Sequence, residues 1–241
     1  MPLDAAESLR ARFVELAPEG FEEAESDGSV ELAAYGESAQ RVAAAFPGAR
    51  LDEVEPGWED RWREFHRPVR LGPLWIGPPW LAPPADALAV VIDPGRAFGT
   101  GAHPTTRLCL GLLLEQQRGS VLDIGCGSGV LAIAASLLGH APVVAVDDAA
   151  PAVEATEANA AANAAEVAVE LLDATAATLP PSDLALANIA LAQVESLGAG
   201  LRSARVITSG YLADEQPEIA GYRRLERREL DGWAGDLFEQ A

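Results

Sequence analysis

The segment "VLDIGCGSGVLAIAAS", residues 121–136, restricts the possible folds more than any other stretch of this chain. It reads as a short apolar strand, a loop with glycine at alternate positions (Gly125, Gly127 and Gly129) and an apolar helix. Glycine lets a backbone turn sharply and approach a ligand with no Cβ atom in the way. A strand that is apolar throughout and leads directly into a helix is typical of parallel sheets covered on both faces. The segment therefore predicts an α/β domain that binds a ligand beside this loop.

The chain beyond residue 86 alternates between strand and helix patterns. The expected strands are short apolar runs, and the expected helices carry apolar residues three and four positions apart. Strict alternation of this kind indicates a doubly wound parallel sheet of the Rossmann-like class. We expect strands at 88–92, 120–124, 142–147, 167–172, 183–188 and 204–209, and helices at 104–117, 129–138, 151–163 and 190–202. A short helix is expected over about 212–220, and "YRRLERREL" with "GWAGDLFEQ" predicts a terminal hairpin.

The first 56 residues predict a second, smaller domain. Their pattern gives a helix, two strands, a helix and a strand, an order that indicates a ferredoxin-like α+β domain without its first strand. The expected elements lie at 4–17, 20–25, 29–34, 37–46 and 50–55. Residues 57–85 predict a linker helix, with Trp58, Trp62 and Phe65 on one packing face, and a Pro- and Gly-rich connecting segment. We therefore expect three parts: 1–56, 57–85 and 86–241.

The formal charge of −20 limits the partners that this chain can bind. Nucleic acid needs clustered lysine and arginine, so we expect no direct nucleic-acid contact. A basic protein surface suits this charge better, although the acidity could also serve solubility alone. All 17 basic residues are arginine, so the chain has no lysine. The N-terminus does not read as a signal peptide and no apolar run reaches membrane-spanning length, so we expect a cytoplasmic protein.

The spacing of the glycines separates two classes of nucleotide ligand. Asp123 precedes them in a D-x-G-x-G-x-G pattern, in which the third glycine follows the second by two positions rather than three. This pattern resembles motif I of the S-adenosylmethionine-dependent methyltransferases and differs from the dinucleotide fingerprint. Asp147 ends the next expected strand, where its carboxylate can accept hydrogen bonds from both ribose hydroxyls. The sequence therefore favours S-adenosylmethionine as the cofactor.

Three further polar residues follow expected strands. Asp148 is expected to cap the next helix, and Asp173 either accepts a hydrogen bond from the adenine amino group or belongs to a simple turn. Asn188 ends the fourth strand of the expected sheet, at the carboxyl edge where such folds bind ligands; a helix cap is the alternative. Glutamine and adenine methyltransferases have proline and an aromatic residue after this asparagine. The absence of both disfavours a planar amide or nucleobase acceptor.

Three segments together resemble one family closely. "DPGRAFGTGAHPTTRLCL" at 93–110, "VLDIGCGSGVLAIAA" and "ANIALA" resemble the bacterial methyltransferases of ribosomal protein L11, the PrmA family. Spaced tryptophans extend the resemblance, which covers about residues 57–210. It implies that Phe98 to Thr106 covers the cofactor and that Asn188 is the catalytic residue beside the transferable methyl. The cofactor contacts that it implies are Phe98, Gly99, Thr100, Thr106, Gly125, Gly127, Asp147 and Asn188.

The resemblance also implies the activity. It points to a monomeric enzyme that transfers methyl groups from S-adenosylmethionine to lysine side chains of a large-subunit ribosomal protein of the stalk base, with the N-terminal amine left open as a further acceptor. It assigns substrate recognition to the small domain and catalysis to the large one, with no metal. His103 is expected to orient the cofactor-covering segment, with a catalytic role as the alternative, and Pro104 is expected to begin a helix. Cys109 and Cys126 are expected to be small packing residues.

Departures from the family pattern leave alternatives open. The first strand of the small domain is missing, Asn-Ile-Ala-Leu replaces Asn-Ile-Leu-Ala, and the Pro-Gly-Gly turn expected after Leu201 is absent. The same fold could methylate lysines of another protein or a small amine, or could bind S-adenosylmethionine without catalysis. A nicotinamide-dependent oxidoreductase would need the longer glycine spacing.

Overall fold

The structure, a computed structural model, describes Leu16 and residues 22–26, 29–34, 36–46, 48–50, 67–93 and 101–241. The expected helices at 4–17 and 57–66 and the expected strand at 50–55 lie almost entirely outside these residues. The chain separates into two compact units, Met1–Arg61 and Trp62–Ala241. The expected division into 1–56, 57–85 and 86–241 stays a prediction.

The N-terminal unit contains a two-stranded antiparallel sheet followed by a helix. β1 (Glu22–Ser26) pairs with β2 (Ser29–Ala33), from Glu22 opposite Ala33 to Ser26 opposite Ser29. α2 (Gly36–Ala45) comes next, and its Val42 side chain is buried. Arg41 of α2 donates hydrogen bonds to the carbonyl of Leu16 and to the hydroxyl of Ser38. The strands expected at 20–25 and 29–34 and the helix expected at 37–46 therefore form within a residue or two of their predicted ends.

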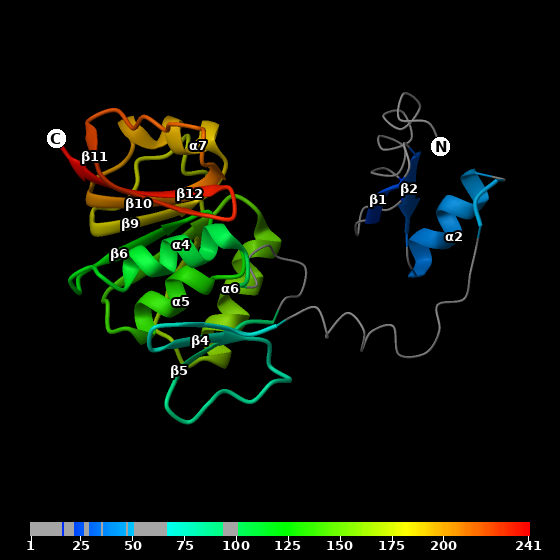
Figure 1. The fold of residues 1–241 in the computed structure, drawn as a ribbon, viewed down its shortest axis with the longest axis horizontal. Helices are drawn as coiled ribbons and strands as arrows, with labels where there is room; N and C mark the ends of the chain where they lie inside the picture. The colour runs from blue at the N-terminus through cyan, green and yellow to red at the C-terminus, as the bar shows by residue number, and fades with distance from the viewer. Residues whose placement is uncertain are drawn as a thin grey trace. The chain divides into compact units, whose positions relative to one another are not determined.

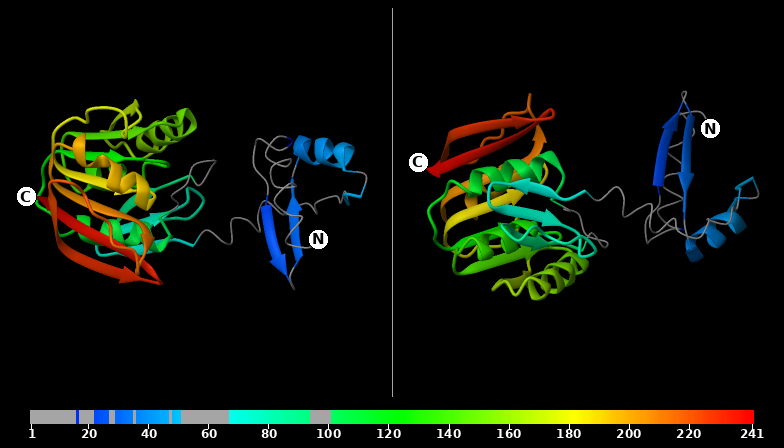
Figure 2. Two further views of the ribbon diagram at one scale, coloured as in Figure 1. Left: turned by 90° about the horizontal axis from the view of Figure 1, so that it is seen from above. Right: turned by 60° about the horizontal axis from the view of Figure 1, so that its bottom comes forward.

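A seven-stranded sheet forms the centre of the second unit (Figure 1), with the strand order β11-β12-β10-β9-β6-β7-β8. Five neighbouring strands, from β10 to β8, run parallel, while β12 is antiparallel to both of its neighbours. The strands are β6 (Val121–Ile124), β7 (Val143–Asp147), β8 (Ala168–Leu171), β9 (Ser182–Asn188), β10 (Ser203–Leu212), β11 (Tyr222–Leu230) and β12 (Trp233–Gln240). The Rossmann-like doubly wound sheet and the terminal hairpin expected from the sequence are both confirmed (Figure 2).

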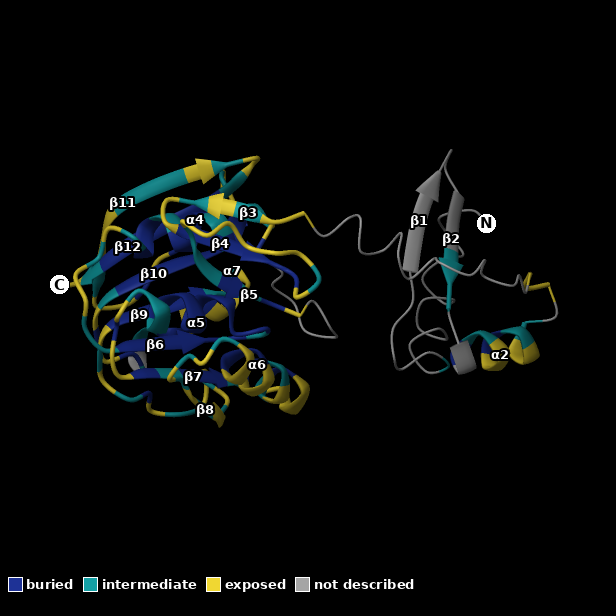
Figure 3. Cartoon of the chain, turned by 90° about the horizontal axis from the view of Figure 1, so that it is seen from below, coloured by how far each residue is buried: buried dark blue, intermediate teal, exposed yellow. Residues whose placement is uncertain are grey.

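Helices cover both faces of this sheet, and two hydrophobic cores result. On one face α4 (Pro104–Leu113), α5 (Val130–Leu137) and α6 (Ala150–Ala162) enclose a core that includes Val121 and Leu186. On the other face α7 (Leu191–Ser196) and the 3₁₀ helix η2 (Leu197–Ala199) pack over Leu122 and Val206. Alternate residues of each central strand thus face opposite cores. Accordingly, the central strands are dark blue for buried in Figure 3, while α6 turns an exposed face outward.

A separate three-stranded sheet packs on the core of the α4–α5 face. Its order is β3-β4-β5, with β3 (Val69–Leu71) antiparallel to β4 (Leu74–Gly77) and β4 parallel to β5 (Leu88–Val91). Ile76 of β4 and Val90 of β5 are buried together with residues of α4 and α5. The strand expected at 88–92 therefore forms, but its place in the large parallel sheet was wrong. An apolar run predicts burial, and the choice of partner strand depends on residues far away in the sequence.

Two helix predictions near the C-terminus need correction. The helix expected over 212–220 does not form, because β10 continues to Leu212 and the connection to β11 consists of turns and irregular chain. The helix expected at 190–202 ends early: α7 stops at Ser196 and gives way to η2. In both places apolar residues cover the sheet from irregular backbone, since Leu201 and Ile219 are buried in the core beneath α7.

Candidate functional site

The glycine loop joins β6 to α5 at the carboxyl edge of the large sheet. Gly125, Gly127 and Gly129 all have positive φ, at +69°, +55° and +81°, a region that other residues rarely adopt. At Gly125 a Cβ atom would also overlap the side chain of Ile189, and at Gly129 it would lie 2.8 Å from Cγ2 of Thr156. Positive φ therefore favours glycine at all three positions, and neighbouring side chains add a steric requirement at Gly125 and Gly129.

Two polar side chains of α6 hold this loop in place. The hydroxyl of Thr156 donates to the carbonyl of Gly127 at 3.0 Å, and the amide of Asn159 donates to the carbonyl of Ser128 at 2.9 Å. Both side chains are buried, at 0% and 5% exposure. Buried carbonyl groups need such partners, so the two hydrogen bonds fix the path of the loop before any ligand binds.

Asp147 lies next to the loop, at the end of β7, as the sequence predicted. Its Oδ2 atom accepts a hydrogen bond from the backbone N–H of Gly127 and its Oδ1 atom from that of Ala149, both at 3.0 Å. A carboxylate has about four acceptor positions, so capacity remains for ligand hydroxyls. The expectation that Asp148 caps the following helix is wrong: Ala149 is the N-cap residue of α6, and no side chain caps it.

Asp123 occupies a buried position on β6, below the loop. Its side chain is 1% exposed, and its Oδ2 atom accepts a hydrogen bond from the backbone N–H of Ala132 at 3.0 Å. Burial raises the pKa of this carboxyl group to about 7, because a charged carboxylate is poorly solvated there. Asp123 therefore ties β6 to α5, and its protonation state can change near neutral pH.

Asn188 and Thr106 form a pair on the other side of the loop. Asn188 ends β9, whose Ala187 pairs with Ile124 of β6, and Thr106 lies buried in the first turn of α4. The Nδ2 atom of Asn188 donates to the hydroxyl of Thr106 at 3.3 Å. The carboxamide oxygen is thus turned away from Thr106 and can accept a hydrogen bond from another donor. The helix-cap alternative for Asn188 is wrong, since Ala190 is the N-cap residue of α7.

The segment that precedes α4 is only partly described. Phe98, Gly99 and Thr100, three of the expected cofactor contacts, lie outside the described residues. His103 is the N-cap residue of α4: its Nδ1 atom lies 2.8 Å from the hydroxyl of Thr105 and accepts from the backbone N–H of Thr105. Pro104 begins the helix, as expected. The position of His103 at this helix end supports an orienting role.

Asn159 and Asn163 were not singled out in the sequence, yet they connect the site to the chain before it. Asn159 accepts from the backbone N–H of Asp93 at 3.1 Å, while Asn163 bonds both the N–H and the carbonyl of Val91. With Thr156 they occupy one face of an otherwise alanine-rich helix. That polar stripe, at spacings of three and four residues, is the sequence signal that could have revealed them.

The remaining candidates have structural surroundings. Asp173 accepts hydrogen bonds from the backbone N–H and the hydroxyl of Thr175, which lower the pKa of its carboxyl group, as in a simple turn. Cys109 and Cys126 are buried free thiols, and burial raises the pKa of Cys126 to about 12. Both cysteines therefore act as packing residues, as expected.

These residues fit S-adenosylmethionine. The loop brings its backbone to the carboxyl edge without side chains, Asp147 offers a carboxylate for ribose hydroxyls, and Asn188 lies on the next strand with its oxygen available. Together with a parallel sheet that ends in an antiparallel hairpin, they are typical of the Rossmann-like, S-adenosylmethionine-dependent methyltransferase class. The comparison with known proteins identifies one family within this class.

The family described as "Ribosomal protein L11 methyltransferase (PrmA)" matches residues 22–230, so the chain belongs to this family. Relatives named ribosomal protein L11 methyltransferase include one from Methylococcus capsulatus, 44% identical over 71% of this chain and 61% of its own length. Another, from Chromobacterium violaceum, is 39% identical over 81% of this chain and 67% of its own. The chain thus spans about three fifths to two thirds of the length of these relatives.

A solved structure agrees with the sequence comparison. The ribosomal protein L11 methylase from Lactobacillus delbrueckii subsp. bulgaricus has a TM-score of 0.64 and 29% sequence identity to this chain. The match covers 73% of this chain and 99% of that one.

The described residues form neither a metal site nor a membrane-spanning helix. No three His, Cys, Asp or Glu side chains in this part of the chain gather closely enough to hold a metal ion. Among the described helices, none is long and apolar enough to cross a membrane.

Proposed function

We propose that this chain methylates ribosomal protein L11, with S-adenosylmethionine as the methyl donor and lysine side chains as acceptors. The amine at the N-terminus of the substrate is a further acceptor to be tested. The observation that carries the proposal is the Asn188–Thr106 pair beside the glycine loop, in a chain of the PrmA family. We further propose that the enzyme acts as a cytoplasmic monomer and makes no direct contact with nucleic acid.

The site suits an amine acceptor for a chemical reason. When bound, S-adenosylmethionine supplies an electrophilic methyl group, which an amine can attack only through a free lone pair. A lysine with a pKa of about 10.4 costs roughly 4–5 kcal/mol to deprotonate at neutral pH. The carboxamide oxygen of Asn188 can accept a hydrogen bond from a neutral amine, and it carries no charge that would favour the ammonium form. Asn188 would therefore orient the acceptor without opposing its deprotonation.

The cofactor contacts are proposed for residues on both sides of the loop. Asp147 would bind the ribose hydroxyls, and Gly125 and Gly127 would bring the backbone close to the cofactor. Thr106 would contact it from α4 and Asn188 from the end of β9. We keep Phe98, Gly99 and Thr100 in this set on the strength of the family resemblance. The small N-terminal domain would recognise the substrate, and the formal charge of −20 suits a basic protein partner.

The direct test is mass spectrometry of purified ribosomal protein L11 after incubation with the enzyme and S-adenosylmethionine. The enzyme contains no lysine, so every methyllysine in the mixture comes from the substrate. The expected result is a mass gain in multiples of 14 Da, about the mass of one CH₂ unit, on L11 peptides that contain lysine. The assignment of the substrate would be overturned if L11 stayed unmodified while parallel reactions with other ribosomal proteins or a small amine gave methylated products.

Two variants test the role of Asn188 in the same assay. Asn188→Ala should lower the single-turnover rate by about a hundredfold, the cost expected for a misplacement of about 1 Å. Asn188→Asp should also slow transfer, because a carboxylate favours the protonated amine. Cofactor affinity is measured in parallel, and the rates are compared at saturating S-adenosylmethionine, because Asn188 also belongs to the proposed cofactor contacts. Equal single-turnover rates in the three proteins would remove Asn188 from the mechanism.

A further inference from the structure

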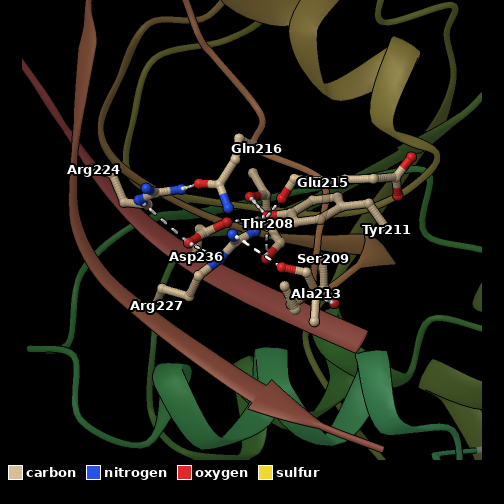
Figure 4. A network of polar contacts seen from close by, with 10 residues as sticks. Thr208, Ser209, Tyr211, Ala213, Glu215, Gln216, Arg224, Arg227 and Asp236 are labelled. Carbon is tan, nitrogen blue, oxygen red and sulfur yellow. Dashed lines mark hydrogen bonds and ion pairs between the residues drawn. The ribbon is translucent and has the colours of Figure 1, made fainter. Parts of the chain in front are cut away.

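A buried carboxylate on β12, two strands from β9 in the sheet order, lies at the centre of a polar network (Figure 4). Asp236 of β12 is completely buried, and its Oδ2 atom accepts a hydrogen bond from the hydroxyl of Tyr211 at 2.9 Å. Tyr211 also shares a hydrogen bond of 2.6 Å with the hydroxyl of Thr208. From β11, the guanidinium groups of Arg227 and Arg224 approach Oδ1 of Asp236 to 3.1 and 3.8 Å. Three strands therefore contribute side chains to one point.

Two β-bulges make this convergence possible. In β10 the register shifts between Ser209 and Tyr211, so Gly210 is the extra residue; in β11 it shifts between Arg224 and Glu226. Residues three apart normally lie on opposite faces of a strand, and one extra residue brings them to the same face. Thr208 and Tyr211 can both reach Asp236 only with the bulge at Gly210.

The polar character of this network calls for an explanation other than stability. A buried ion pair usually contributes little net stability, because desolvation of the charges offsets their attraction. Its established use is to specify one register, since an alternative register would leave a buried charge without partners. Burial and the neighbouring carboxylate also raise the pKa of Tyr211, so its phenol stays protonated and donates to Asp236. The network thus selects the bulged form of β10.

The bulge in turn bears on the proposed methyl-transfer site. Gly210 has φ +107°, and a Cβ atom there would overlap the carbonyl of Ile189. The backbone N–H of Ile189 donates to the carbonyl of Ser209 at 3.1 Å, and Ser209 is paired with Asn188. The side chain of Ile189 fills the space beside Gly125, where a Cβ atom would overlap it. Ile189 is therefore held between the bulge and the glycine loop, directly after Asn188.

We propose that Thr208, Tyr211 and Asp236 are positioning residues for methyl transfer. Their hydrogen bonds fix the bulge at Gly210, and the bulge sets where Ile189 and Asn188 lie relative to the glycine loop. This inference rests on the proposed function, in which Asn188 orients the acceptor amine. It differs from a purely structural role, because it requires that loosening the bulge changes the rate of transfer and the surroundings of the Asn188 side chain.

The kinetic test compares two tyrosine variants of the full chain. Tyr211→Phe removes the hydroxyl that joins Thr208 to Asp236 and keeps the ring. Tyr222→Phe is the matched control: its hydroxyl donates to the carbonyl of Ser203 at 2.7 Å, at the opposite end of β10. With L11 as substrate, Tyr211→Phe should lower kcat by about ten- to hundredfold with KM within threefold of wild type. Tyr222→Phe should keep kcat within twofold. A kcat within twofold for Tyr211→Phe would overturn the proposal.

Conservative substitution of Thr208 separates the hydrogen bond from packing. Thr208→Val keeps the shape of the side chain and removes the hydroxyl, so it should behave like Tyr211→Phe. Thr208→Ser keeps the hydroxyl and should retain kcat within about threefold of wild type. The opposite order, with Thr208→Ser impaired and Thr208→Val active, would show that packing matters and would overturn the proposed network.

A readout without turnover separates this inference from the proposed function. The two side-chain N–H signals of Asn188, assigned through their loss in Asn188→Ala, report on its position in the ¹⁵N-labelled protein. They should shift in Tyr211→Phe and stay in place in Tyr222→Phe. If the wild-type enzyme fails to methylate L11, the proposed function fails and these signals still decide the inference. Asn188 signals that are unchanged in Tyr211→Phe would overturn it.

Discussion

At the scale of single residues, Asp147 is the side chain whose loss should weaken cofactor binding most selectively. Its carboxylate faces the glycine loop, and hydrogen bonds to a charged group contribute about 1.5–3 kcal/mol. Asp147→Ala should therefore raise the Kd for S-adenosylmethionine by about ten- to hundredfold, as measured by calorimetry. The matched control is Asp148→Ala, which removes the same charge from an exposed neighbour and should bind like wild type. Equal affinities in the two variants would contradict the assignment.

Asp123 provides a prediction about pH. Its folded-state pKa of about 7 lies above the ordinary value of 3.8 for an aspartate, so the folded protein holds this proton more tightly than the unfolded chain. The stability from this group is complete below about pH 4 and is lost as the pH rises to about 7. Asp123→Asn keeps an oxygen for the N–H of Ala132 and cannot titrate. Within this window, the wild-type minus variant difference in unfolding free energy should fall by about 1.4 kcal/mol per pH unit. Urea unfolding at several pH values measures it, and a constant difference would refute the assignment.

The sequence could identify those site residues whose role depends on nearby chain. The glycines of the loop and Asp147 were predicted because a strand, a turn and the end of the next strand are local patterns. The hydrogen bond between Asn188 and Thr106 was not predicted, because Thr106 lies in α4, far from Asn188 in the sequence. The role of Asp236 was also missed, because the sequence analysis treated its segment only as one strand of a hairpin. The four arginines of the preceding strand are the signal that could have indicated a charge pair with this aspartate.

At the scale of elements, α6 connects the glycine loop to the end of β5 and to Asp93, which precedes the proposed cofactor-covering segment. Asn159 bonds the carbonyl of Ser128 in the loop and the N–H of Asp93. Asn159→Ala should leave both backbone groups unsatisfied and lower the unfolding free energy by about 1–3 kcal/mol. Because the loop loses a support, the Kd for S-adenosylmethionine should also rise, by about three- to tenfold.

Asn163→Ala is the matched control for this prediction. Asn163 is the C-cap residue of α6, and its side-chain hydrogen bonds go to Val91 of β5 and to the carbonyl of Asn159, none of them to the loop. It should destabilise the protein by a similar amount in urea unfolding and leave cofactor affinity within about twofold. If calorimetry finds the same affinity for both variants, α6 supports the fold and has no separate role in shaping the loop.

Elements were predictable where burial alone decides the structure. The strands and helices from β6 to β9 lie within about three residues of their expected ends, because apolar runs and glycine positions mark them. The sheet to which β5 belongs was not predictable, since an apolar run does not determine which strand pairs with it. The prediction of a helix at 212–220 was wrong for a related reason. Its apolar residues suggested a helix, yet Ile219 is buried from an irregular connection.

At the scale of the whole molecule, two compact units divide the chain, and the described residues that we propose for the cofactor site all belong to the second one. The large sheet, both of its cores and the three-stranded sheet lie within residues 67–241. A unit with its own cores has the physical requirements to fold independently. The division of labour, with substrate recognition in the small domain, is therefore open to a direct experiment on a shortened chain.

A chain that begins near Gly57 should bind S-adenosylmethionine with a Kd within about twofold of the full chain, because it keeps the glycine loop, Asp147 and Asn188. It should methylate intact L11 at least tenfold more slowly at low substrate concentration, since the lost contacts would have contributed binding energy remote from the reacting amine. A short lysine peptide, which lacks the rest of the L11 surface, should be methylated equally by both chains. Full activity of the shortened chain on intact L11 would assign substrate recognition to the second unit instead.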